Sequence, residues 1–274
     1  MPELPEVEAY RRLAEQSALG RRIAAVEAPD PWFLKGGVRA CDVDAALVGS
    51  TLVAARRRGK LLLLDTDGGR TLGLRFGMTG RLAVDGTAGV DQLLYTSRRD
   101  EPVWDRFTLS FASGAGGLAL ASEAGRLGRL RVNDPRRLGG VVLDPDEGSL
   151  GPDALGVTPK QLAAALGRSA APLKARLLDQ ARLAGVGNLM ADELLWRAGL
   201  APQRPAASLT PAEARRLHRQ LRRTVELLID RGGSHLGDLT PSRLPGGTCP
   251  RDGTPLARAT VGGRTTWWCP EHQR

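Results

Sequence analysis

The chain has 274 residues, 42% of them hydrophobic, which is enough for a globular protein of two or three modules. It contains no apolar run of about 18 residues and no signal-peptide pattern, which argues against membrane insertion and export. The net charge is +9, which favours a polyanionic partner such as nucleic acid, although a basic proteome with an ordinary surface would give the same balance. The three cysteines are too few for a disulfide framework and indicate a reducing compartment.

The first predicted element is an amphipathic helix over residues 5–19. Val7, Tyr10 and Leu13 recur at helical spacing, and Gly20 offers a stop. We expect the apolar stripe of this helix to pack on the elements that follow it.

The start of this helix gathers a nucleophile and two carboxylates. Residue 2 is small, so removal of Met1 is expected, and the mature chain would begin with the secondary amine of Pro2. An α-amino group titrates at about pH 8, so part of it is unprotonated and nucleophilic at neutral pH. If Pro5 takes the first helical position, Glu3 and Glu6 lie one turn apart. The alternative is that these acidic residues only offset the helix dipole.

The chain up to residue 143 is predicted to be mostly β and to form the first domain, 1–143. Strands are expected at 22–27, 51–55, 61–65, 71–76, 106–112 and 118–121, separated by glycine-rich turns such as 67–69 and 113–117. The fold class is therefore α+β and multidomain, with a β-sandwich or flattened barrel and one helix against it.

Two features of this half are candidates for nucleic-acid contacts. The run Arg56-Arg57-Arg58-Gly59-Lys60 precedes an apolar strand and could hold phosphates, or it could protect an edge strand from aggregation. Met78 is flanked by glycines at a strand end, which favours a tight loop that presents the side chain, whereas a buried gap-filling methionine is the alternative.

A third candidate is the segment from Asn133 to Gly139. Asp-Pro forms a turn, after which Arg136, Arg137 and Leu138 follow on a short loop. Two arginines and an apolar residue in this setting predict a wedge for the base stack.

The composition changes after Leu143, and 144–151 is predicted to be a linker into a helical domain, 152–235. Helices are expected at 158–167, 171–182, from Asn188 onward, and at 210–232, the first and last beginning with capping boxes. Glycines before Asn188 permit a turn whose following helix points its first amides outward, where a phosphate fits, although a plain helix connector has the same pattern. His218 is interpreted as a surface or boundary residue.

The last module, 245–274, has the ligand spacing of a zinc ribbon. Cys249 and Asp252 are separated by sixteen residues from Cys269 and His272. Carboxylate oxygen can bind zinc, so we expect one structural zinc ion on these four residues, with a metal-free hairpin as the alternative. Between the pairs, Arg264 at a glycine turn predicts a hairpin tip that contacts a phosphate.

The chain resembles the formamidopyrimidine-DNA glycosylase/endonuclease VIII family in motifs that span nearly its whole length. These motifs are Met1-Pro-Glu-Leu-Pro-Glu-Val-Glu, Gly77-Met-Thr-Gly, Asp134-Pro-Arg-Arg-Leu-Gly, the helix-two-turns-helix signature over 177–193, and the zinc-finger-like tail. Thr79 and Leu138 replace the usual serine and phenylalanine, and Asp252 replaces the usual cysteine. The resemblance implies catalytic residues Pro2, Glu3, Glu6 and Lys60, and DNA contacts at Met78, Arg136, Arg137, Leu138, Lys174, Asn188 and Arg264.

The function implied by the resemblance is a bifunctional DNA glycosylase and AP lyase of base excision repair. It would extrude an oxidised base from double-stranded DNA, excise it through a Schiff base on Pro2, and nick the strand by β,δ-elimination. The protein is expected to be a cytoplasmic, nucleoid-associated monomer. Only fifteen residues separate Gly233 from Cys249, where relatives carry a longer excursion over oxidised guanine. This shortness leans toward the endonuclease VIII side of the family or toward a broader lesion range. The alternatives are a relative specialised for oxidised pyrimidines or for bulky or crosslinked lesions, and a DNA-binding protein that has lost catalysis.

Overall fold

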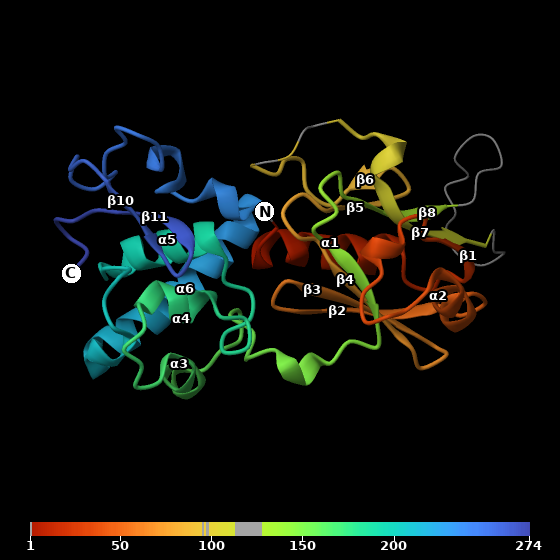
Figure 1. The fold of residues 1–274 in the computed structure, drawn as a ribbon, viewed down its shortest axis with the longest axis horizontal. Helices are drawn as coiled ribbons and strands as arrows, with labels where there is room; N and C mark the ends of the chain where they lie inside the picture. The colour runs from red at the N-terminus through yellow and green to blue at the C-terminus, as the bar shows by residue number, and fades with distance from the viewer. Residues whose placement is uncertain (1, 95, 97–98, 113–127) are drawn as a thin grey trace. The chain divides into compact units, whose positions relative to one another are not determined.

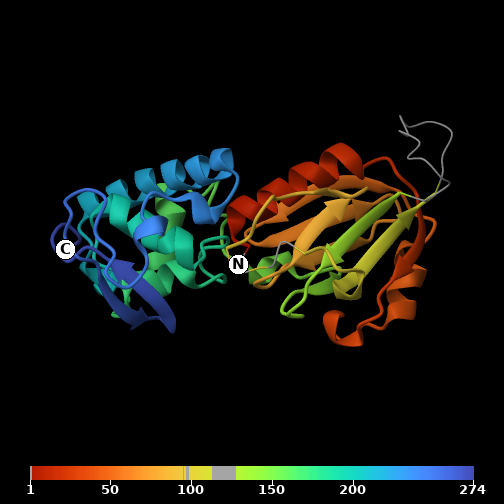
Figure 2. The ribbon, with the colours of Figure 1, turned by 90° about the horizontal axis from the view of Figure 1, so that it is seen from above.

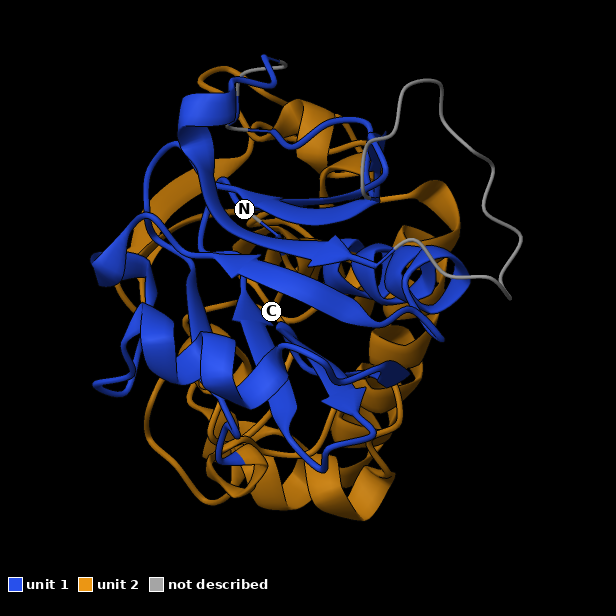
Figure 3. Ribbon diagram, turned by 90° about the vertical axis from the view of Figure 1, so that its right-hand side faces the viewer, with its two compact units in different colours: residues 1–2, 6–146 blue, residues 3–5, 147–274 orange. Residues whose placement is uncertain are grey.

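The computed structural model describes residues 2–94, 96, 99–112 and 128–274. The chain divides into two compact units, which Figure 3 shows in separate colours. Unit 1 comprises Met1–Pro2 and Glu6–Asp146, and unit 2 comprises Glu3–Pro5 and Glu147–Arg274. Among the described residues, no helix is long and apolar enough to cross a bilayer.

Two antiparallel sheets form unit 1 (Figures 1 and 2). The four-stranded sheet has the order β2 (Leu52–Arg58), β3 (Leu61–Thr66), β4 (Thr71–Arg75), β9 (Gly140–Leu143). The five-stranded sheet has the order β1 (Ile23–Glu27), β7 (Asp105–Phe111), β8 (Arg129–Asn133), β5 (Arg81–Val84), β6 (Thr87–Ala88). One hydrophobic core contains side chains from both sheets, which confirms the predicted β-sandwich.

The predicted amphipathic helix is α1 (Leu4–Ser17), and its apolar stripe joins this core. Val7 and Tyr10 are completely buried there, and the helix is followed by Gly20 at a φ of 76°. A second helix, α2 (Ala40–Leu47), was not predicted because its eight residues give barely two turns of apolar periodicity.

The strand prediction was incomplete. It missed β5, β6 and β8 of the five-stranded sheet and β9 of the four-stranded sheet, each of only two to five residues. The predicted strand 118–121 and turn 113–117 lie outside the described residues.

Unit 2 contains the helical part of the chain. Its helices are α3 (Pro159–Leu166), α4 (Leu173–Leu178), α5 (Asn188–Ala198) and α6 (Pro211–Arg231). The capping boxes of α3 and α6 are present as predicted. The helix predicted to reach Arg182 ends at Leu178 instead, because the Asp179 carboxylate accepts the Ala181 N–H and competes with helix continuation.

The last element of unit 2 is a hairpin of β10 (Ala257–Val261) and β11 (Arg264–Trp268). Its turn, Gly262-Gly263, has positive φ at both residues, which glycine tolerates best. A Cβ on Gly262 would lie 2.9 Å from the Ala175 Cβ, so the hairpin tip packs directly on α4. Short 3-10 helices complete the chain: η1 (Pro31–Phe33), η2 (Pro102–Trp104), η3 (Glu147–Ser149), η4 (Ala206–Ser208), η5 (Ser234–Leu236) and η6 (Thr240–Ser242).

Candidate active site and DNA interface

The Glu3 carboxylate is bound by the N-terminus of α5. Its Oε1 accepts the Leu189 N–H at 2.9 Å and its Oε2 accepts the Met190 N–H at 3.0 Å, and the side chain is completely buried. A helix N-terminus stabilises an anion through its free amides and its dipole. We expected these amides to face outward toward a phosphate, and this was wrong, because Glu3 occupies them.

Gly187 makes this arrangement possible. It is the N-cap of α5, and a Cβ at this position would lie 2.1 Å from the Glu3 Cδ. The glycine is therefore required by the close approach of the carboxylate rather than by its backbone angles.

Pro2 and Glu6 belong to unit 1, and both are buried. Glu6 lies near Tyr10, whose pKa is raised well above its usual value by burial and then by the Glu6 charge.

Lys60 lies in the tight turn between β2 and β3 and is half-buried. Two neighbours in its basic run have acidic partners. The Arg57 Nε lies 3.0 Å from the Glu8 carboxylate, and the Arg56 Nε lies 2.6 Å from that of Asp65. Because β2 is an edge strand, the 45% exposed Arg56 fits the protective alternative, whereas the Arg57 side chain is only 5% exposed and joins β2 to α1 through Glu8.

The Met78 loop and the 134–139 loop pack against each other in unit 1. Gly77 has a φ of 55°, and a Cβ there would lie 2.4 Å from the Leu138 carbonyl carbon. The Asp134 carboxylate is completely buried and binds both loops, since it accepts hydrogen bonds from the Thr79 hydroxyl and the Gly139 N–H. Hence the Met78 loop and the predicted wedge loop are joined in unit 1.

Met78, Arg136 and Leu138 all belong to these two joined loops. The Arg136 Nη1 lies 3.8 Å from the Met78 Sδ, and Leu138 is 50% exposed. Arg137 differs, because its guanidinium binds the Asp30 carboxylate at 2.5 and 2.6 Å. This hydrogen bond raises the pKa of Arg137 and lowers that of Asp30. Arg137 therefore serves to anchor the loop in this structure.

Lys174 is not on the surface of unit 2. Its ammonium group is completely buried, 2.6 Å from the Asp192 Oδ1, and it donates to the Thr266 hydroxyl at 2.7 Å. Burial lowers its pKa, and the Asp192 charge partly opposes that shift. Arg243 binds the other Asp192 oxygen at 2.8 Å. Through these contacts, Lys174 and Asp192 connect α4, α5 and the hairpin inside unit 2.

Asn188 and Arg264 remain available for a ligand. Asn188 is half-buried at the first position of α5, and its Oδ1 is buried without a hydrogen-bond partner in the described part of the chain. Arg264 is exposed at the start of β11, and its guanidinium has no ion pair with any residue in the described ranges.

Cys249, Asp252, Cys269 and His272 could hold a metal ion, since their ligand atoms all lie within 4.8 Å of one another. The Cys249 sulfur accepts hydrogen bonds from the Trp196 Nε1 at 3.3 Å and the Arg251 N–H at 3.4 Å, which suits a thiolate. The His272 Nε2 lies 3.3 Å from the Trp196 carbonyl, which directs the Nδ1 toward the cluster. Two sulfurs, one nitrogen and one oxygen match the ligand preference of a tetrahedral site.

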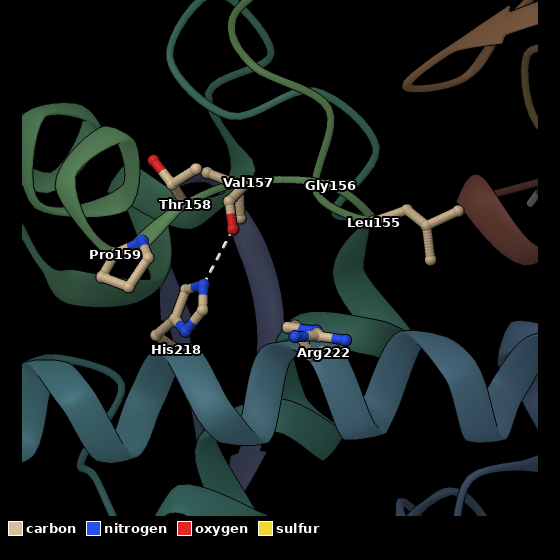
Figure 4. Close-up of a pocket in the computed structure, with 7 residues that line it drawn as sticks. All are labelled: Leu155, Gly156, Val157, Thr158, Pro159, His218 and Arg222. Atoms are coloured by element: carbon tan, nitrogen blue, oxygen red, sulfur yellow. Dashed lines mark hydrogen bonds between the residues drawn. The ribbon is translucent and has the colours of Figure 1, made fainter.

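A cavity of about 290 Å³ lies between α3 and α6, and Figure 4 shows it. Its lining residues are Leu155, Gly156, Val157, Thr158, Pro159, His218 and Arg222. The His218 Nε2 lies 2.8 Å from the Val157 carbonyl, so this histidine joins a loop to α6. No pair of groups suited to acid-base chemistry lines the cavity, so we assign no catalysis to it.

Sequence reasoning missed two carboxylates that organise the site, Asp134 and Asp192. The Asp-Pro turn was a signal for Asp134, because an aspartate before a turn often binds nearby backbone amides. Asp192 gave no comparable signal, because its partners Lys174, Arg243 and Trp267 come from distant parts of the chain.

Two family models match the chain. The formamidopyrimidine-DNA glycosylase N-terminal domain matches residues 1–141, and the formamidopyrimidine-DNA glycosylase H2TH domain matches residues 150–239. Formamidopyrimidine-DNA glycosylase of Thermus thermophilus is 36% identical over 291 residues, covering 100% of this chain and 98% of the relative. The Carboxydothermus hydrogenoformans protein of the same name is 34% identical, with complete coverage of both chains.

Solved structures of a formamidopyrimidine-DNA glycosylase are also similar to this chain. Lactococcus lactis Fpg in complex with DNA containing Fapy-dG has a TM-score of 0.80 at 25% identity, covering 99% of this chain and 100% of that one. The same enzyme with DNA containing an oxidised pyrimidine has a TM-score of 0.79 at 26% identity, with both chains fully covered. The chain therefore belongs to the formamidopyrimidine-DNA glycosylase family.

Proposed function

We propose that this protein is a bifunctional DNA glycosylase and AP lyase of base excision repair that acts through Pro2. The observation that carries the proposal is the completely buried Glu3 carboxylate, fixed by two amides of α5 directly beside the terminal proline in sequence. A carboxylate held in this way can transfer protons at a defined position. The relatives named above act on damaged DNA, which supplies the substrate class.

In the proposed reaction, the free Pro2 nitrogen attacks the C1′ of the damaged nucleotide, and the base leaves with a proton from solvent. The Glu3 carboxylate takes the proton that the Pro2 nitrogen carries and passes it to the ring oxygen as the sugar opens, which leaves a cationic Schiff base between Pro2 and C1′. This cation acidifies the C2′ proton. Removal of the C2′ proton expels the 3′ phosphate, and a second elimination expels the 5′ phosphate. Hydrolysis of the Schiff base then releases the sugar fragment and restores the Pro2 amine. Glu6 and Lys60 are the other two catalytic residues in this proposal.

The DNA contacts are assigned according to the geometry of each unit. Met78, Arg136 and Leu138 would fill the space of the extruded base, because they belong to the two joined loops. Asn188 and Arg264 would bind phosphates. We assign Arg137 and Lys174 to positioning instead, since the first is paired with Asp30 and the second is buried against Asp192.

The decisive test is borohydride trapping on duplex DNA with an abasic site. A covalent adduct is expected only for chains whose intact mass shows that Met1 is absent, and a chain with a fixed extension before Pro2 serves as the matched control. DNA binding without any adduct from the processed chain would favour a catalytically inactive binding protein instead. Because its substrate would be chromosomal, we place the protein at the bacterial nucleoid in the cytoplasm.

We further propose that the four-residue cluster holds one structural zinc ion. Cys249, Asp252, Cys269 and His272 supply the ligands, and no chemical step involves the ion. Elemental analysis should give one zinc per chain, and Asp252→Cys should bind zinc more tightly than the wild type because thiolate is the softer ligand. A zinc-free protein with an unchanged hairpin would contradict this assignment.

The segment 234–248 favours a broad lesion range. It is short and held in place, because the Leu239 N–H binds the Glu193 carboxylate at 2.8 Å and the Arg231 Nη1 binds the Leu236 carbonyl at 2.8 Å. A fixed segment offers less enclosure for one particular base. Single-turnover rates on a panel of 8-oxoguanine, formamidopyrimidine and oxidised pyrimidine duplexes should therefore differ little, and a strong preference for 8-oxoguanine would contradict this proposal.

A further inference from the structure

Three large apolar side chains are exposed around the 134–139 loop of unit 1. Val103 is 73% exposed, Trp32 is 68% exposed and Leu138 is 50% exposed. Leu138 was predicted as part of the wedge, whereas Trp32 and Val103 have no assigned role. A tryptophan usually buries most of its large apolar surface, so its exposure beside a functional loop is informative.

Both residues lie on short 3-10 helices that are attached to the loop. For η1, Asp30 caps the helix and also binds the Arg137 guanidinium, and a Cβ on Gly139 would lie 3.1 Å from the Phe33 ring. For η2, the Trp104 carbonyl accepts the Asp134 N–H at 2.9 Å. The positions of Trp32 and Val103 are therefore fixed relative to the wedge.

Lys35 holds the Trp32 indole in place. Its Nζ lies 4.9 Å from the ring centroid and donates to the Trp32 carbonyl at 2.6 Å. The stem of Lys35 packs on the loop exit, since a Cβ on Gly140 would lie 2.7 Å from the Lys35 Cε. The result is a pre-positioned aromatic face with a cation beside it.

We infer that Trp32 is an additional DNA-contacting residue, which packs on a base or a deoxyribose next to the nucleotide that the wedge displaces. This inference rests on the proposed function. The charges around the patch identify the occupant as DNA, because Lys35, Arg136 and Arg106 lie on or beside it and the whole chain carries +9. An aromatic ring flanked by cations is the usual combination for binding bases and backbone together. Val103 extends the apolar surface on the other side of the loop.

The test compares Trp32→Ala with Trp32→Phe, and uses Val53→Ala as the matched control. Val53 is 52% exposed on β2 of the same unit, and β2 and β9, the strand that follows the loop, lie at opposite edges of the four-stranded sheet. Stacking on a base is worth about 1–3 kcal/mol, so Trp32→Ala should weaken the Kd for a duplex with a tetrahydrofuran abasic analogue by roughly 5- to 150-fold. Trp32→Phe should retain most of the affinity, and Val53→Ala should retain all of it.

A second measurement uses intrinsic fluorescence. Binding of the same duplex should quench wild-type emission more than Trp32→Phe emission, because only the first contains the indole at this position. Equal Kd values for the wild type and Trp32→Ala, or equal quenching for the wild type and Trp32→Phe, would overturn the inference.

The outcomes for the inference and for the proposed function can be separated. Trp32→Ala should still form the borohydride adduct at saturating abasic DNA, because Trp32 takes no part in the bond-making step. Absence of an adduct in the wild type would refute the proposed chemistry. A wild-type adduct together with an unaffected Trp32→Ala would refute only the role of Trp32.

Discussion

Each unit of the molecule contains a completely buried carboxylate that accepts backbone N–H groups, and the two differ in where those groups come from. In unit 1, Asp134 binds the Gly139 N–H, five residues away, and the Arg136 N–H, two residues away. In unit 2, Glu3 binds the amides of Leu189 and Met190, more than 180 residues away. Both carboxylates have lost water and regained hydrogen bonds.

The difference shows what each carboxylate can do. Asp134 closes a local turn and shapes a surface, so its contribution should be structural and limited to its loops. Glu3 follows Pro2 in sequence while its partners, Leu189 and Met190, lie at the start of α5, so its orientation depends on the fold of a distant segment. Substitutions should therefore separate a chemical role from a structural one.

The largest effect is expected at Glu3. Glu3→Gln retains one acceptor oxygen but cannot transfer a proton, so strand scission at saturating DNA should slow by roughly 10²- to 10⁴-fold. Single-turnover assays on abasic duplex measure this rate. Glu8→Gln, which alters a buried carboxylate of α1 that pairs with Arg57 of β2, is the control and should keep the rate. An unchanged rate of strand scission in Glu3→Gln would show that Glu3, like Asp134, has only a structural role.

The next largest effect is expected at Asp192, a second buried carboxylate of unit 2, which pairs with charged side chains where Glu3 binds backbone amides. Asp192→Asn leaves the charges of Lys174 and Arg243 buried without their counterion and should cost about 3–5 kcal/mol of unfolding free energy at pH 7. Lys174→Met should cost less, because Arg243 still neutralises Asp192. Urea denaturation of both variants measures the difference.

The pH dependence of the Asp192→Asn variant follows from the lowered pKa of Lys174. Because the folded state binds this proton less readily than the unfolded state, raising the pH toward the ordinary lysine range favours folding. The stability deficit of Asp192→Asn should therefore shrink as the pH rises. A deficit that grows with pH would contradict the assignment of the buried charge to Lys174.

A smaller effect is expected at Asp134. Asp134→Asn replaces one acceptor oxygen with an NH₂ group that faces an N–H or O–H donor, which should cost about 1–3 kcal/mol. The adduct rate at saturating DNA should stay within a few-fold of the wild type, because the residue takes no part in the chemistry. A loss of chemistry comparable to that of Glu3→Gln would show that the loop does more than shape a surface.

The smallest effect is expected at Glu213, a partly exposed carboxylate that serves as a reference for the two buried ones. Hydrogen bonds from Arg204, and then from the Thr210 N–H, lower the pKa of Glu213 to about 2. Glu213→Gln keeps the capping-box acceptor but loses the charge paired with Arg204, so it should cost about 0.5–1 kcal/mol at neutral pH. Because the folded pKa is lowered, the difference from the wild type should persist above about pH 4.5 and disappear as the pH falls toward 2. Urea denaturation at several pH values in this range measures the difference in unfolding free energy between the variant and the wild type. A difference that persists near pH 2 would contradict the prediction.

The features that sequence reasoning predicted are those with local causes. The helix at the chain start, the capped helices α3 and α6, the Met78 loop and the metal-ligand spacing all depend on residues within a few positions of one another. The features that it missed depend on tertiary partners. Lys174 was expected at a phosphate but is buried because Asp192 and Thr266 surround it, and the α5 amides are filled because Glu3 arrives from the other end of the sequence.

The close approach of Gly187 to Glu3 limits which residues the chain can accept far from its first turn. A Cβ at position 187 would lie 2.1 Å from the Glu3 Cδ, so even alanine would push the carboxylate off the α5 amides. Positions 3 and 187 are therefore constrained as a pair, although they lie far apart in the sequence. A change at either position can persist only if the residue at the other still fits.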